Sequence, residues 1–72
     1  MNQHEVITTY YSEDGSKANV IHDNNKAEYY VEYVDNQDNI FYTEDFPGKS
    51  IHYVEDAAEN WALGIKKLEA IN

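Results

Sequence analysis

Residues 27–44 read AEYYVEYVDNQDNIFYTE, two runs rich in tyrosine, valine and isoleucine around one polar cluster. Aromatic and β-branched residues favour strands, whereas asparagine and aspartate favour tight turns. Glu28 and Glu32 alternate with apolar neighbours and mark the wetter face of the first run. A connection this short permits only antiparallel pairing, because parallel strands need a crossover of about a dozen residues or more. We therefore predict a hairpin with strands at residues 27–34 and 39–44.

Two further strands are predicted upstream of this hairpin. Residues 5–11 (EVITTYY) are rich in β-branched and aromatic side chains, and residues 17–22 (KANVIH) form a weaker run. Between them Asp14-Gly15 is a strong two-residue hairpin signal. Residues 23–26 (DNNK) supply the next turn, since asparagine tolerates a positive φ. Three short connections in succession predict an antiparallel meander of four strands.

A helix is predicted for residues 50–69. Pro47-Gly48 ends the last strand, and Ser50 is a good N-cap. Apolar residues then recur at spacings of three and four, namely Ile51, Val54, Ala58, Trp61, Ile65 and Leu68. Gly64 is expected inside the helix, where it marks a close approach to the sheet. The prediction is one α+β domain over residues 1–72: a four-stranded antiparallel meander with one C-terminal helix packed on one face (ββββα), and Trp61 buried beneath the helix.

Centring the turns on Asp14-Gly15, Asn24-Asn25 and Asn36-Gln37 also predicts the strand register. The expected pairs are Thr9 with Val20, Val20 with Tyr29, Tyr29 with Glu44, Val31 with Tyr42, and Tyr33 with Ile40. The face that receives the helix then holds Ile7, Tyr11, Ala18, Val20, Tyr29, Val31, Tyr33, Ile40 and Tyr42. The opposite face holds Tyr10, Ile21, Tyr30 and Phe41 among Asn19, Glu28, Glu32 and Thr43.

This opposite face is the candidate interaction surface, because a fully solvated face has little need for so many aromatic side chains. Its candidate residues are Tyr10, Ile21, Glu28, Tyr30, Glu32 and Phe41. Three readings stay open: an ordinary half-exposed sheet rich in tyrosine and threonine, a surface for a dimer or protein partner, and a small-molecule site.

The charge is strongly acidic, with 14 Asp and Glu against 5 lysines, no arginine and a net charge of −9. Such a surface repels nucleic-acid phosphates and anionic membranes and attracts a basic protein surface. Direct nucleic-acid binding and membrane association are therefore not expected. A second interpretation is that the acids solubilise the protein and discourage edge-to-edge pairing of the sheet.

No apolar run approaches the roughly 20 residues of a membrane span, and the first residues do not resemble a secretory signal. We therefore expect a cytoplasmic protein.

Catalytic and metal-binding signals are weak, so we expect no enzyme, no cofactor and no metal. His4, His22 and His52 lack metal-ligand spacing, and the chain has no cysteine. The acids of residues 35–38 lack the glycine and the oxygen spacing of a calcium loop. Gly48-Lys49-Ser50 echoes a phosphate-binding loop, but position 43, where the first glycine should stand, is Thr43.

Residues 43–50 (TEDFPGKS), running into residues 55–61 (EDAAENW), resemble short proteins encoded by T4-like phages of marine cyanobacteria. The resemblance covers the C-terminal part of the chain and implies expression in the cytoplasm of an infected bacterium. The sequence thus favours a non-catalytic acidic interaction protein, a phage-encoded modulator that binds a basic surface of a host protein. Nucleic-acid mimicry is one version of that function. The alternative is a structural domain that forms a homodimer through the outer sheet face.

Overall fold

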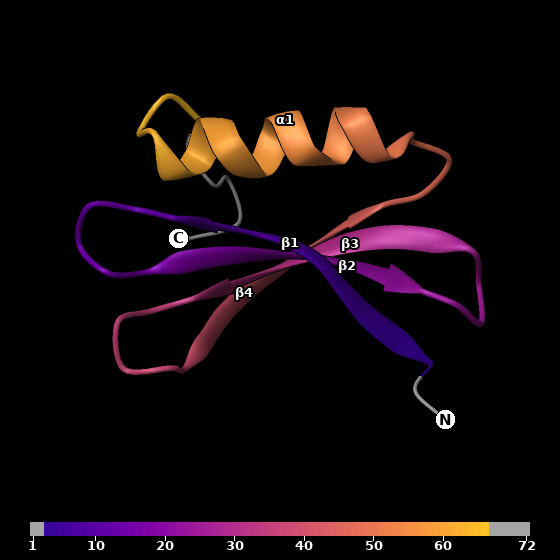
Figure 1. The fold of residues 1–72 in the computed structure, drawn as a ribbon, viewed down its shortest axis with the longest axis horizontal. Helices are drawn as coiled ribbons and strands as arrows, with labels where there is room; N and C mark the ends of the chain where they lie inside the picture. The colour runs from indigo at the N-terminus through magenta and orange to yellow at the C-terminus, as the bar shows by residue number, and fades with distance from the viewer. Residues whose placement is uncertain (1–2, 67–72) are drawn as a thin grey trace.

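The computed structural model describes residues 3–66. The elements are β1 (His4–Tyr11), β2 (Lys17–Asp23), β3 (Glu28–Val34), β4 (Ile40–Phe46) and α1 (Ile51–Ala62). The strands form one antiparallel sheet in the order β1-β2-β3-β4. Figure 1 shows α1 lying across one face of this sheet. The predicted ββββα meander of the α+β class is confirmed, with strand ends within two residues of those expected.

Helix α1 begins where the sequence predicts and ends earlier. The Ser50 hydroxyl accepts a hydrogen bond from the Tyr53 amide at 3.2 Å, as an N-cap should. Gly64 has a φ of 84°, and its amide donates to the Trp61 carbonyl while the Ile65 amide donates to that of Asn60. This left-handed cap closes the helix after Ala62. The prediction of a helix through Gly64 is therefore wrong; its remaining part, residues 67–69 with Leu68, lies outside the described residues.

The hydrophobic core lies between α1 and one face of the sheet. Its buried residues are Ala18, Val20, Val31, Tyr33, Phe46, Val54 and Ala58. Tyr33 is the largest fully buried side chain, and its hydroxyl donates to Glu44 Oε1 at 2.8 Å. Burial raises the pKa of Tyr33, and the bond to the Glu44 carboxylate raises it further. The core thus contains one satisfied polar group, the phenol of Tyr33.

The two later hairpins differ in register from the prediction, but most faces are preserved. Val20 lies opposite Val31 instead of Tyr29, and Tyr33 lies opposite Tyr42 instead of Ile40. Both shifts are of two residues, and side chains alternate with a period of two, so the helix-side placement of these residues is correct.

The first hairpin differs by one residue, which exchanges the faces. The loop closes with the Ser12 amide on the Ser16 carbonyl, and Gly15 takes the positive φ of 91°. Three residues therefore form the turn, and Val20 pairs with Thr8 instead of Thr9. A β-bulge at Ile7 then interrupts the pairing between Val6 and Thr8.

This shift overturns two placements on β1. Tyr10 pairs with Ala18 and packs against the core, so its predicted outer position is wrong. Tyr11 pairs with Lys17 on the outer face and is 68% exposed, so its predicted place beneath the helix is wrong as well. Ile7, also expected beneath the helix, is the extra residue of the bulge and is exposed.

A second irregularity at the start of β4 overturns two more placements. Tyr33 pairs with Tyr42 but Val34 pairs with Ile40, so Phe41 is the extra residue. The Phe41 ring lies 6.4 Å from that of Trp61 on the helix. Ile40 is accordingly on the outer face and Phe41 on the helix side, the reverse of the prediction. Trp61 itself is only half-buried, against Tyr33 and Phe41, and not enclosed as expected.

Candidate interaction surface

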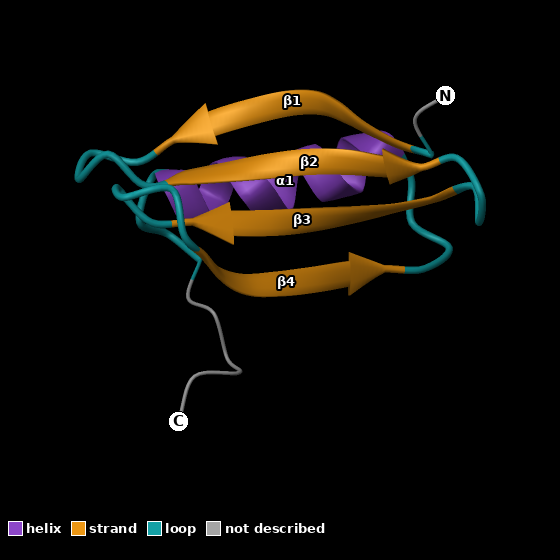
Figure 2. Ribbon diagram, turned by 90° about the horizontal axis from the view of Figure 1, so that it is seen from below, coloured by secondary structure: helices purple, strands orange, loops and turns teal. Residues whose placement is uncertain are grey.

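The sheet face opposite α1, called the outer face below, is the candidate interaction surface. Figure 2 views the molecule from this side, with the four strands in front of the helix. No helix or strand of residues 3–66 covers it. Its members follow from the strand pairing: His4, Val6, Thr9 and Tyr11 on β1; Lys17, Asn19, Ile21 and Asp23 on β2; Glu28, Tyr30, Glu32 and Val34 on β3; Ile40, Thr43 and Asp45 on β4.

Four of the six candidate residues, Ile21, Glu28, Tyr30 and Glu32, lie together on this face. Tyr10 and Phe41 do not, because the three-residue first turn and the bulge on β4 place both on the helix side.

Tyr30 lies at the centre of an acidic group on the outer face. It pairs with Ile21 on one side and with Asp45 on the other. Partial burial raises the pKa of its hydroxyl, and the negative charges of Glu32, Asp23 and Asp45 raise it further. Three carboxylates thus place negative charge near one tyrosine hydroxyl; the carboxylate of Asp23 is buried and accepts hydrogen bonds from the Asn25 and Lys26 amides. We call Tyr30, Glu32, Asp23 and Asp45 the Tyr30 group.

A contact across β2 holds the Tyr30 ring in place. Its hydroxyl lies 3.1 Å from His4 Nδ1, and the two rings meet edge-on at 5.9 Å. Ile21 belongs to the strand between them and is only 4% exposed, although it faces away from the helix. The outer face therefore has a small ordered layer of its own. The sequence did not reveal this His4–Tyr30 contact, because its two residues are distant in the chain.

The acids of the outer face are largely without cationic partners. Within residues 3–66, the ion pairs are Lys17 with Asp38 at 3.7 Å and Lys66 with Glu44 at 3.4 Å. Neither pair involves Glu28, Glu32 or Asp45, so the described lysines do not neutralise the carboxylates around Tyr30. This face carries a negative potential that a cationic group would relieve.

Exposed apolar side chains lie toward the two edges of the same face. Val6 and Tyr11 on β1 are 58% and 68% exposed, and Ile40 on β4 is 56% exposed. Sequence reasoning missed all three as surface residues. The three-residue first turn brings Tyr11 to this side and the bulge on β4 brings Ile40, and both depend on the folded pairing.

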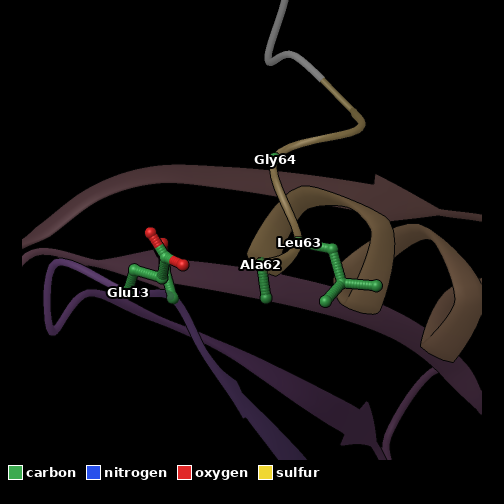
Figure 3. Close-up of a pocket in the computed structure, with 5 residues that line it drawn as sticks. Glu13, Ala62, Leu63 and Gly64 are labelled. Atoms are coloured by element: carbon green, nitrogen blue, oxygen red, sulfur yellow. The ribbon is translucent and has the colours of Figure 1, made fainter.

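Two hollows lined by described residues are shallow. One, of about 220 Å³, lies between the β1–β2 turn and the end of α1 and is lined by Ser12, Glu13, Ala62, Leu63 and Gly64. Figure 3 shows the Glu13 carboxylate on the turn facing the region of Ala62, while Leu63 extends away from it. The other, of about 350 Å³, lies along α1 by Tyr53, Asn60 and Lys66.

Metal-ligating and catalytic groups are not gathered anywhere in the described part of the chain. Among residues 3–66, no three His, Asp or Glu side chains are arranged to hold a metal ion. His22 packs its ring on Tyr29 at 4.8 Å, and His4 contacts Tyr30, so both contribute to packing. His52 is exposed in the first turn of α1.

The short helix α1 is neither long nor apolar enough to cross a membrane, and residues 3–66 contain no other helix. Comparisons with known protein families, curated proteins and solved structures each find no match to this chain.

Proposed function

We propose that this protein is a non-catalytic interaction protein that binds a basic surface of another protein through the outer face of its sheet. The observation that carries the proposal is the Tyr30 group on a sheet face that no described element covers. An aromatic ring attracts a cation over its face, and Arg or Lys beside carboxylates forms charge-assisted hydrogen bonds. The half-exposed Tyr30 suits the role of an anchor within a polar rim.

The acidic composition of the outer face also discriminates between partners. In a face-to-face homodimer, Glu28, Glu32 and Asp45 would meet the same residues of a second copy. Juxtaposed like charges in an interface oppose association. The geometry therefore favours a basic foreign partner over the homodimer that the sequence left as an alternative.

The resemblance to proteins of T4-like phages supports a host protein as that partner. Nucleic-acid mimicry is the version in which these carboxylates occupy a groove meant for phosphates. In that version the protein competes with DNA or RNA for the same basic groove, and its own affinity for nucleic acid stays negligible.

The test is a titration with an arginine-rich peptide at low and at physiological salt. The variant Glu32→Gln/Asp45→Asn removes two charges beside Tyr30 and should weaken binding about fivefold. The matched control, Glu13→Gln/Asp38→Asn, removes the same charge in the turns at one end of the sheet and should change binding less than about twofold.

Equal losses in the two variants would mean that only net charge attracts the peptide, and the proposed role of the outer face would be wrong. An absence of binding to the arginine-rich peptide would overturn the proposed function altogether. Sedimentation of the free protein tests the homodimer, which predicts a concentration-dependent dimer.

A further inference from the structure

The strand β1 forms an open edge of the sheet with unusually little protection. It pairs with β2 on one side, and no strand formed by residues 3–66 lies on the other. Its residues 6–11 read VITTYY and carry no charge. Exposed edges tend to recruit another strand, and proteins usually protect them with charged residues, proline or bulges. The charged Glu5 and the bulge at Ile7 are such devices, but both precede Thr8 and leave Thr8 to Tyr11 as a regular edge.

The opposite edge, β4, is protected differently. Glu44 and Asp45 lie within the strand, and Lys66 reaches Glu44 at 3.4 Å from beyond the helix. A bulge at Phe41 disturbs its first residues. Charged side chains along an edge discourage the addition of another strand. The two edges of the sheet are therefore not equivalent, and β1 is the one suited to pairing.

Helix α1 places carboxylates beside this open edge. Glu55 Oε2 accepts a hydrogen bond from Thr8 Oγ1 at 2.8 Å, which positions the acid over β1. Burial raises the pKa of Tyr10, two residues further along β1, and the nearby charges of Glu55, Glu59 and Asp56 raise it further. The ion pairs within residues 3–66 involve Lys17 and Lys66, neither of which meets these acids.

We propose that β1 accepts an extended segment of a basic protein as a fifth strand, pairing along Thr8 to Tyr11, with its alternate lysine or arginine side chains facing Glu55 and Glu59. In such strand addition the main chain supplies hydrogen bonds, and every second side chain determines specificity. The other side chains of the added segment lie on the outer face near Tyr11, and apolar residues suit that position. The partner segment thus alternates basic and apolar residues.

A second copy of this chain fits the edge poorly. Antiparallel pairing of β1 with β1 of another molecule extends the sheet about a two-fold axis perpendicular to it. Both helices then lie on the same side, and Glu55 and Glu59 of the two copies face each other across the new pair. This repulsion favours a basic strand, the occupant that matches the charge of the site.

The inference rests on the proposed function for the basic character of the partner. The experiment below distinguishes strand addition at β1 from binding of a basic partner to the outer face. The probe is a short peptide that alternates lysine and valine, and its control has the same charge with a central proline that cannot pair along a strand. Hydrogen exchange of the backbone amides is followed by NMR. Solvent-facing amides within Thr8 to Tyr11 should exchange at least about tenfold more slowly with the alternating peptide and be unchanged by the proline peptide.

Two matched double variants locate the charges that matter. Glu55→Gln/Glu59→Gln should lower the affinity for the alternating peptide about fivefold, because glutamine keeps the acceptor for Thr8 but loses the charge. Glu13→Gln/Asp38→Asn removes the same charge from the turns at one end of the sheet and should weaken binding of this peptide less than about twofold. The amide spectrum of each variant verifies the fold.

Binding without protection of the β1 amides, or equal binding of the proline peptide, would overturn strand addition. In that case the proposed function of the outer face would stand if Glu32→Gln/Asp45→Asn lowers the affinity for the arginine-rich peptide more than its matched control does. Failure of both peptides to bind would remove the basic partner and both proposals with it.

Discussion

Replacing Tyr33 by phenylalanine tests the polar group inside the core. The phenol is fully buried, and its oxygen lies 2.8 Å from Glu44 Oε1. Phenylalanine keeps the ring and its contact with Trp61 at 5.0 Å but removes the donor. The substitution thus isolates one hydrogen bond to a carboxylate, with little change in packing volume.

The expected loss follows from the surroundings of Glu44. A hydrogen bond to a charged group contributes roughly 1.5–3 kcal/mol. Glu44 keeps Lys66 at 3.4 Å, and its side chain remains 25% exposed, so water replaces the lost donor in part. We therefore expect a loss of about 1.5 kcal/mol at pH 7. For a domain of this size that lowers the melting temperature by roughly 6–12 °C.

The same residue predicts a dependence on alkaline pH. The pKa of Tyr33 is raised in the folded state, so this phenol stays neutral there after it ionises in the unfolded chain near pH 10. Its contribution is complete below pH 10 and is lost as pH rises above that value. The stability difference between the wild type and Tyr33→Phe should therefore shrink between about pH 10 and 11.

Urea unfolding followed by circular dichroism at pH 7 and at alkaline pH measures both effects. Tyr11→Phe is the control, because Tyr11 is 68% exposed and its loss of a hydroxyl should change the free energy of unfolding by less than about 0.5 kcal/mol. If Tyr33→Phe is as stable as the wild type at pH 7, the Tyr33–Glu44 bond does not stabilise the core. A stability difference that does not change with alkaline pH would contradict the raised pKa.

Three further changes test other parts of the molecule. Trp61→Ala should cost about 2 kcal/mol in urea unfolding, less than a fully buried tryptophan, because Trp61 is half-buried against Tyr33 and Phe41; a cost near zero would place the indole outside the packed layer. Gly64→Ala should lower the free energy of unfolding by roughly 1 kcal/mol, since the φ of 84° disfavours any side chain although the site has open space; an unchanged value would show that the C-cap does not stabilise α1. Added NaCl should raise the melting temperature by screening the repulsion of a net charge of −9, and a melting temperature that falls with salt would mean that local pairing already compensates the acids.

The order of elements could be predicted from the sequence because it depends on local patterns. Alternation in residues 27–34 and the turn residues after them define a hairpin, and Ser50 defines the start of α1. The end of α1 could not be predicted from the apolar spacing alone, which continues through Ile65. Gly64 stops the helix because a left-handed cap satisfies the last carbonyls there.

The predicted face was correct for the residues at the centre of the candidate surface and wrong for two residues at its margins. Tyr30, Glu28 and Glu32 alternate within one strand, so their shared face follows from the period of two. Tyr10 and Phe41 depend on how each turn closes and on where the extra residue of each bulge falls. Several turn geometries suit the same Asn, Asp and Gly residues at little difference in energy.

The amino-acid sequence by itself determined the ββββα order, the strand ends within two residues, the helix N-cap and the excess of negative charge. The pairing of the strands determined which side chains share a face, and the packing of α1 brought Glu55 to the open edge of β1. The physical reason is that alternation within a strand is local, whereas the choice between its two faces depends on a single residue of register. That choice is made when the whole core forms, because the helix buries one complete set of side chains and leaves the other to solvent.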